Sequence, residues 1–284
     1  MEFFQDILQY SFLQKALVTA IIVGIICGVI GSFIILRGMA LMGDAISHAI
    51  LPGVSISYML GVNYFYGAVM FGVLTAISIG FISEHSKIKS DSSIGIVFTA
   101  FFALGIIFMS KAQTATDLTQ ILFGNVLSVR TSDMVLTIIV GIIIVSVVFL
   151  FYKQLLLSTF DETMAIVVGL PTKVIHYVIM ILLTLATIAS LQTVGVVLVV
   201  AMLITPAATA YLLTNRFSTM ILLASFIGAL SSVIGLYFSF KHNLSSGAVI
   251  VLVATILFCL AFIFSPKQGL LWRVMRKYHL QTKT

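Results

Sequence analysis

The sequence predicts an all-α fold, a polytopic helical membrane bundle of about eight to nine transmembrane helices. Of its 284 residues, 61% are hydrophobic and only 8% are charged, whereas charged residues make up about 25% of a typical soluble domain. The mean hydropathy is +1.21. The apolar residues also form continuous runs of helix length, such as LTIIVGIIIVSVVFLFY (136–152). A membrane β-barrel would instead show short segments of alternating hydrophobicity.

The predicted spans follow from the thickness of the membrane. A hydrocarbon core about 30 Å thick requires roughly 20 apolar helical residues. We therefore expect a single transmembrane domain over residues 1–284. Its spans are expected at 13–36, 42–60, 64–83, 93–110, 134–152, 173–190, 194–213, 217–240 and 246–265.

The basic residues predict the orientation of the bundle, because cytoplasmic loops carry an excess of Lys and Arg. With the C-terminus inside, only Lys15, Lys111, Arg130 and Lys241 fall outside. We therefore expect an outer N-terminus and a cytoplasmic C-terminus. The net charge of +6 is scattered between apolar runs, which argues against nucleic acid as a partner. The predicted cytoplasmic set is Arg37, Lys87, Lys89, Lys153, Lys173, Arg216, Lys267, Arg273, Arg276, Lys277 and Lys283.

A short cytoplasmic helix is expected between the spans at 134–152 and 173–190. The segment FDETMAIVVGLP (160–171) has acidic residues at its start, an apolar stripe, and a glycine and a proline at its end, a pattern typical of a helix with defined ends. Such a helix is either a connector lying at the membrane surface or a docking element for a soluble partner. The segment alone leaves both interpretations open.

Asp44 and His48 form an ionisable pair within an apolar run, MGDAISHAIL (42–51). Charged groups inside a bilayer are costly and mark ion pathways, relays or internal pairs. Because the two residues are four apart, a helix places both side chains on one face. A carboxylate oxygen and an imidazole nitrogen suit divalent ions such as manganese, iron or zinc. We predict that the pair binds a metal, although two ligands are too few for a closed site.

Pro52 supports a transport role for this segment. It has no amide hydrogen, so a helix running through it leaves the carbonyl of His48 without its usual donor. Discontinuous helices of this kind often line transport sites, and we predict a second helix break at Pro206. Two structural alternatives remain for the pair: an Asp–His hydrogen bond that fixes helix packing, or a helix cap by Asp44.

Missing motifs restrict the function further. The chain has no His-Glu-x-x-His or Gly-x-Ser-x-Gly motif, so it is not expected to be an enzyme. It also lacks the phosphate-binding Gly-x-x-x-x-Gly-Lys-Ser/Thr motif, so an ATP-driven transporter would need a separate motor subunit. The alternative is a secondary transporter that uses Asp44 as a proton or sodium carrier. That alternative has no evident use for a cytoplasmic docking helix.

Four motifs resemble those of the permeases of bacterial manganese/zinc/iron ABC importers. They are GDAISHAILPG (43–53), ILFGNVL (121–127), FDETMAIVVGLP (160–171) and VGVVLVVAMLITPAATA (194–210). The resemblance implies a homodimeric permease in the lipid of the bacterial plasma membrane, paired with two cytoplasmic ATP-binding subunits and supplied by an extracellular metal-binding protein. It also makes the helix within 160–171 a coupling helix, seated in the ATPase through Asp161, Glu162, Gly169 and Pro171.

The same resemblance makes Asp44 and His48 transient ligands of the transported metal, with no permanently bound cofactor. A carboxylate and an imidazole with room for water or carbonyl oxygen suit manganese, whereas zinc favours more nitrogen or sulfur ligands. We therefore expect manganese as the substrate, with zinc or iron as the alternatives.

Overall fold

The computed structural model describes residues 9–112 and 126–265 and shows an all-α membrane protein, as predicted. In this part of the chain, eight helices are long and apolar enough to cross a membrane. These helices are α2 (Ser11–Arg37), α5 (Tyr64–His85), α6 (Ser90–Ala112), α8 (Thr131–Leu150), α11 (Thr172–Val194), α12 (Val196–Leu213), α13 (Phe217–His242) and α14 (Ser246–Phe264). The shorter elements are α3 (Leu41–Ala49), α4 (Leu51–Met59), the 3-10 helix η1 (Val126–Ser128), α9 (Tyr152–Phe160) and α10 (Glu162–Val167).

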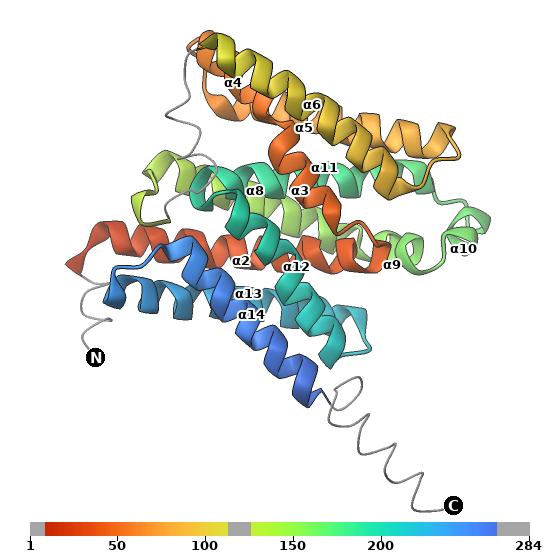
Figure 1. Ribbon diagram of the computed structural model, residues 1–284. Helices are drawn as coiled ribbons and strands as arrows, with labels where there is room; N and C mark the ends of the chain where they lie inside the picture. The colour runs from red at the N-terminus through yellow and green to blue at the C-terminus, as the bar shows by residue number, and fades with distance from the viewer. Residues whose placement is uncertain (1–8, 113–125, 266–284) are drawn as a thin grey trace, which may run out of the picture.

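The span expected at 42–60 is corrected to two helices of nine residues each, α3 and α4. The helix is interrupted at Ile50, whose backbone stays in the right-handed region with φ −78° and ψ −12°. Pro52 lies in the first turn of α4, where its missing amide hydrogen prevents a continuous ladder of backbone bonds. Together α3 and α4 cross the bundle obliquely, from the end where α10 lies to the end where α5 begins (Figure 1).

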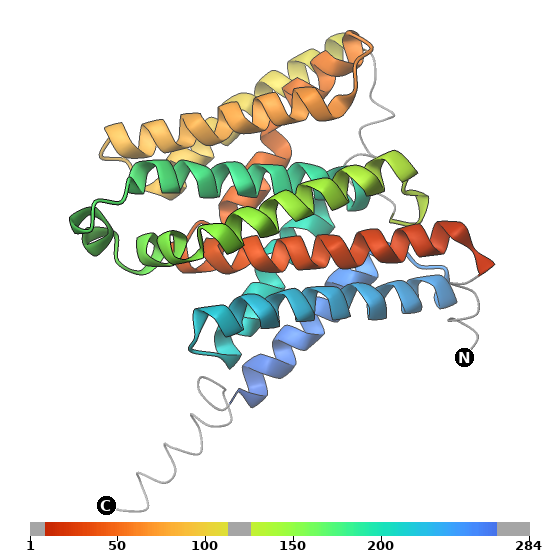
Figure 2. The ribbon, with the colours of Figure 1, turned by 180° about the vertical axis from the view of Figure 1, so that it is seen from behind.

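The long helices lie side by side, and α12 and α14 cross them obliquely in both views (Figures 1 and 2). Helix α2 occupies the interior and is buried along most of its length, from Leu13 to Ile34. Its neighbours approach closely because small residues face one another: a Cβ atom added at Gly24 would lie 2.6 Å from the carbonyl carbon of Gly228 on α13. Small residues at such contacts are the usual way in which membrane helices pack.

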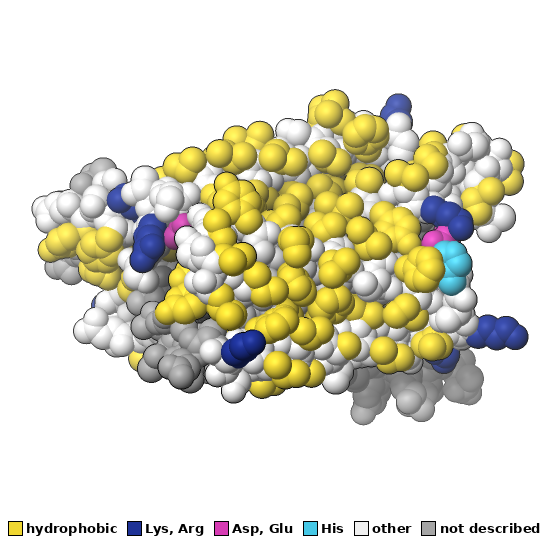
Figure 3. Space-filling model, turned by 90° about the horizontal axis from the view of Figure 1, so that it is seen from above, with side chains coloured by type: hydrophobic (Ala, Val, Ile, Leu, Met, Phe, Trp, Pro, Cys, Tyr) yellow, Lys and Arg dark blue, Asp and Glu magenta, His cyan; other side chains and the backbone are white. Residues whose placement is uncertain are grey.

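On the face seen in Figure 3, most charged side chains lie toward the two ends of the bundle, and hydrophobic side chains cover most of the band between them. At the end where α10 lies, hereafter the α10 end, Lys173 forms an ion pair with Glu84, and Arg37 bonds to α9 and α11. At the opposite end, Lys15 Nζ donates to Thr131 Oγ1 over 2.8 Å. The predicted cytoplasmic Arg37 and Lys173 thus lie together, and the predicted outer Lys15 lies at the other end.

Candidate transport site

Asp44 and His48 lie one above the other on α3, as their spacing predicts. The Nε2 atom of His48 is 3.6 Å from Oδ1 of Asp44, and the side chains are 26% and 49% exposed, respectively. This distance is longer than a hydrogen bond. Nor is Asp44 the cap of α3, because Ala40 occupies that position and caps nothing through its side chain.

The residues that pack around the pair come from the middle of helices long enough to span a membrane. The His48 ring packs edge-on against Phe98 and Phe102 of α6, with centroids 5.9 and 5.6 Å away. A Cβ atom added at Gly43 would lie 2.9 Å from Cδ1 of Leu203, in the middle of α12. A carboxylate and an imidazole inside a bilayer are costly unless they meet a partner.

His48 has an unused nitrogen atom. Its Nδ1 is buried and has no hydrogen-bond partner among the described residues, while its Nε2 faces Asp44. The carboxylate and the imidazole therefore retain free lone pairs that a cation can accept. No group of three or more His, Cys, Asp or Glu side chains suited to a metal occurs in the ranges 9–112 and 126–265. Within these ranges, Asp44 and His48 are thus two side chains of one copy of the chain that could hold a cation together.

The hydroxyl groups close to the pair are engaged with the backbone. Ser47 Oγ donates to the carbonyl of Gly43 over 2.8 Å, and Ser55 Oγ donates to the carbonyl of Leu51 over 2.9 Å. Both bonds run back by one helical turn. These serines therefore help to satisfy the backbone of α3 and α4, and the pair remains the ionisable feature of this segment.

The helix break at Pro52 is accompanied by close packing on both sides. A Cβ atom at Gly105 of α6 would lie 2.8 Å from Cβ of Leu51 and 3.2 Å from Cδ of Pro52, and a Cβ atom at Gly53 would lie 2.0 Å from the carbonyl oxygen of Gly67 on α5. Pro206 differs from Pro52, because α12 runs unbroken from Val196 to Leu213 with Pro206 inside it. The predicted break at Pro206 is therefore wrong.

Replacing Pro52 by Ala should lower transport without preventing insertion into the membrane. Alanine supplies the amide hydrogen that a continuous helix would donate to the carbonyl of His48, so α3 and α4 would join into one straighter helix. We expect unchanged membrane abundance and reduced metal uptake. A fully active P52A variant would show that the break serves only packing.

The short helix predicted within 160–171 is present as α10, and its ends are formed as the sequence indicates. Asp161 caps it, with Oδ1 accepting from the amide of Met164 over 2.8 Å. At the other end Gly169 has φ +84°, and the amides of Gly169 and Leu170 donate to Ile166 and Ala165, the paired bonds of a Schellman motif. Glycine is favoured here because this φ is strained for other residues.

The surface of α10 is apolar and exposed although it lies beyond the ends of α9 and α11 (Figure 1). Val167 is 75% exposed, and Met164, Ile166 and Val168 are also exposed, whereas Ala165 is buried. An exposed apolar patch outside the membrane-spanning part of a protein marks an interaction surface.

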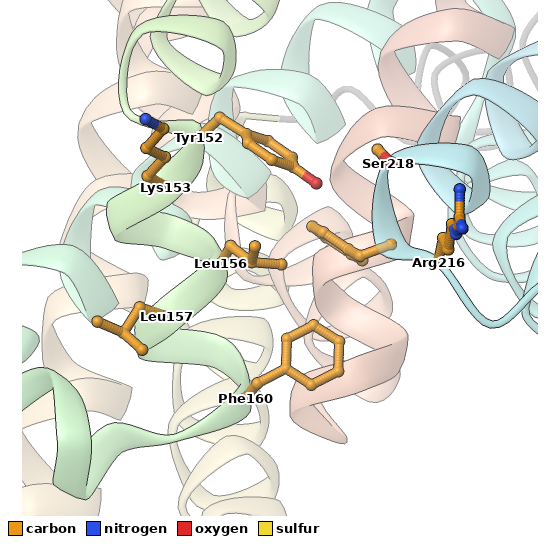
Figure 4. A pocket seen from close by; sticks show the side chains of 8 residues that line it. Tyr152, Lys153, Leu156, Leu157, Phe160, Arg216 and Ser218 are labelled. Carbon is orange, nitrogen blue, oxygen red and sulfur yellow. The ribbon is translucent and has the colours of Figure 1, made fainter.

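A hollow of about 560 Å³ lies between α9 and the start of α13, far in sequence from the ionisable pair. Figure 4 shows Tyr152, Leu156 and Phe160 facing the first turn of α13 across it. Because neither Asp44 nor His48 lines it, we assign it to the surface around α10 and not to the transport site. Its lining consists of Tyr152, Lys153, Leu156, Leu157, Phe160, Arg216, Phe217 and Ser218.

Sequence reasoning missed a polar cluster at the α10 end. Arg37, the last residue of α2, donates from Nη2 to Ser158 Oγ over 2.7 Å and from Nε to Thr159 Oγ1 over 3.2 Å, both on α9. Its Nη1 lies 3.1 Å from Nδ1 of His176 on α11. In the sequence Arg37 counted only as an orientation signal, because its partners are more than 120 residues away. No local pattern connects them.

Several sequence predictions lie outside the described residues. These are most of the outer connection, including the larger part of ILFGNVL (121–127), and the basic residues from Lys267 onward.

In the described part of the chain, eight helices long enough to cross a membrane, the interrupted segment α3–α4 with its ionisable pair and the exposed apolar helix α10 are features of a multi-pass membrane transport protein. The family model described as the ABC 3 transport family matches residues 9–265. The chain therefore belongs to this family, and the resemblance seen in its motifs is confirmed.

Individual relatives match over nearly the whole chain. The chain is 64% identical to "Manganese transport system membrane protein MntC" of Listeria monocytogenes, over 98% of this chain and 99% of that protein. It is 51% identical to "Manganese import system permease protein ScaB" of Streptococcus gordonii, over 97% and 99%. Among solved structures, PsaBC from Streptococcus pneumoniae in complex with Fab matches with a TM-score of 0.85 and 51% identity, covering 94% of this chain and 96% of that chain.

Proposed function

We propose that this chain is the permease subunit of an ATP-driven manganese importer in the bacterial plasma membrane, in which Asp44 and His48 bind the metal transiently as it crosses. The observation that carries this proposal is the open pair on α3, 3.6 Å apart, with a free nitrogen on His48. A transport site must release its ion as well as bind it. Two protein ligands that leave other positions to water suit that requirement better than a closed cage of four.

The choice of manganese rests on ligand chemistry and on the relatives. A carboxylate oxygen with one imidazole nitrogen is a mixed donor set without sulfur, and no cysteine joins the pair in a group of three possible ligands within the described ranges. Such a set suits manganese better than zinc, which favours more nitrogen or sulfur. The two relatives above are named for manganese. Zinc and iron are the alternative substrates.

The partners of the permease follow from what one copy of the chain lacks. Without a nucleotide-binding motif, the chain needs an ATP-binding subunit, and the exposed apolar surface of α10 is the place for it to dock. With only two ligands per copy, a second copy of the chain can complete the metal's coordination across a two-fold axis. This arrangement places the α10 end in the cytoplasm, with the N-terminus outside and the C-terminus inside, and leaves the opposite end to receive an extracellular metal-binding protein.

Loss of the gene tests the substrate. We expect cells lacking it to show a selective fall in manganese content, measured by mass spectrometry of whole cells, and the wild-type chain to restore it. A selective fall in zinc or iron would assign one of those metals instead. Manganese uptake that persists when ATP is depleted but collapses with the proton or sodium gradient would instead support a secondary transporter.

A further inference from the structure

We propose that Arg37 is a positioning residue that transmits the movement of the α9–α10 segment to the metal ligands on α3. This inference rests on the function proposed above and concerns how the transport site responds to the motor subunit. It follows from the position of Arg37 between four helices. The guanidinium group of Arg37 contacts α9 and α11, and Arg37 is the last residue of α2, shortly before α3 begins.

The contacts of Arg37 hold three helices at a single point. Ser158 and Thr159 belong to the last turn of α9, directly before α10, and each accepts a hydrogen bond from Arg37. Thr159 also donates to the carbonyl of Leu155 over 2.7 Å, so its hydroxyl is oriented to accept. A guanidinium group has no acceptor atom, so Nδ1 of His176 must accept from Nη1 over 3.1 Å. The donors and acceptors therefore match at all three contacts.

A charged residue of α10 also interacts with the helices that meet at Arg37. Glu162, the first residue of α10, lies close enough to interact electrostatically with both Arg37 and His176. A displacement of α10 thus changes the surroundings of the guanidinium group as well as pulling on α9. The half-buried position of Arg37 strengthens these interactions, because water screens them less than at an exposed site.

The connection from Arg37 to the metal ligands is short and stiff. Helix α2 ends in paired backbone bonds, from Gly38 to Ile35 and from Met39 to Ile34, with Gly38 at φ +67°. Helix α3 then begins at Leu41, and Asp44 follows Arg37 by only seven residues. A shift of the Arg37 side chain relative to α9 is therefore passed through one tight turn to the helix that carries Asp44 and His48.

Arginine is needed here because its planar fork presents several donors in a fixed arrangement, whereas lysine offers a single charged nitrogen on a flexible stem. Arg37→Met should remove the link but keep most of the apolar stem. Arg37→Lys should retain one contact at a time and give an intermediate effect. Lys87→Met is the matched control, since Lys87 is an exposed cation near the α10 end that forms no ion pair within the described ranges.

The test follows the movement at two positions in the full complex of the permease with its ATP-binding subunit. An environment-sensitive fluorophore is attached to a cysteine at Thr163 on α10, outside the apolar docking surface, or at Leu41 on α3. Both positions are exposed, and the background is Cys259→Ser because Cys259 is an exposed thiol. The signal is compared between the nucleotide-free state and the state trapped with ATP and vanadate. In the wild type and in K87M we expect both positions to respond.

In R37M we expect the response at Thr163 to persist and the response at Leu41 to fall at least fivefold, with a matching fall in manganese transported per ATP hydrolysed. An unchanged response at Leu41 in R37M would overturn the proposal, and so would the loss of both responses, which would place the damage at docking. The proposed function fails separately: in that case the wild-type complex in vesicles would show no ATP-dependent manganese uptake, whatever the fluorophores report.

Discussion

Replacing Asp44 by Asn or His48 by Gln is expected to abolish most ATP-driven metal uptake while leaving the protein folded in the membrane. Loss of a residue that only supports a metal ligand typically lowers metal affinity by about 10- to 100-fold, so loss of a ligand itself should reduce uptake by at least about 10-fold. Both replacements keep a polar side chain of similar size, so the packing against Phe98 and Phe102 is disturbed little. Uptake of radioactive manganese into membrane vesicles measures the effect.

The matched control for these variants lies on the same helix. Ser47 stands between the two ligands and is buried, but its hydroxyl donates to the carbonyl of Gly43. Ser47→Ala should therefore retain uptake within about twofold, since a single helix back-bond of this kind contributes on the order of 1 kcal/mol or less to stability. Wild-type uptake by both D44N and H48Q would return the pair to a role in helix packing.

Changing the exposed face of α10 should have the second largest effect, by separating ATP hydrolysis from transport. Val167→Asp places a charge in the middle of the apolar surface that we assign to the ATP-binding subunit, where an unpaired buried charge is strongly unfavourable. We expect V167D to lose assembly with that subunit, or to retain ATP hydrolysis without metal uptake. Co-purification and the number of metal ions transported per ATP hydrolysed measure the two outcomes.

The acidic start of α10 needs a different design, because Asp161 has a structural role. Its carboxylate caps α10, so reversing the charges of Asp161 and Glu162 together should uncouple transport partly by loosening the helix, at a cost of about 1 kcal/mol for the cap. Asp161→Asn keeps the cap and removes the charge. Coupling retained in D161N would confine Asp161 to capping, whereas coupling lost would assign its charge to docking. Normal coupling in V167D would contradict the assignment of this surface.

The spans could be predicted from the sequence because length and hydrophobicity alone determine them in a membrane protein. The weak point was 42–60, where hydropathy continued through a break that depends on the missing amide of Pro52. Pro206 shows that the same residue type need not interrupt a helix, since α12 continues through it. Neighbouring helices can satisfy the freed backbone groups around a proline, and that compensation cannot be seen in one sequence.

The candidate site was also only partly predictable from the sequence. Asp44 and His48 are four residues apart, so local geometry was sufficient to pair them, and the caps of α10 were visible as an acidic start and a glycine–proline end. The surroundings of the pair were not visible, because Phe98 and Phe102 reach His48 from another helix. The cluster around Arg37 was missed for the same reason, because its partners are brought together by tertiary packing and not by a local sequence pattern.

The most direct test of the account is ATP-driven manganese uptake by the purified permease and its ATP-binding subunit in sealed vesicles, with the extracellular metal-binding protein supplied on the opposite side. We predict that manganese accumulates only with ATP and only with His48 and Asp44 intact, while D44N and H48Q still assemble and hydrolyse ATP. Accumulation of manganese by the D44N/H48Q double variant at the wild-type rate would contradict the account, because the metal would then cross by a route that does not use this pair.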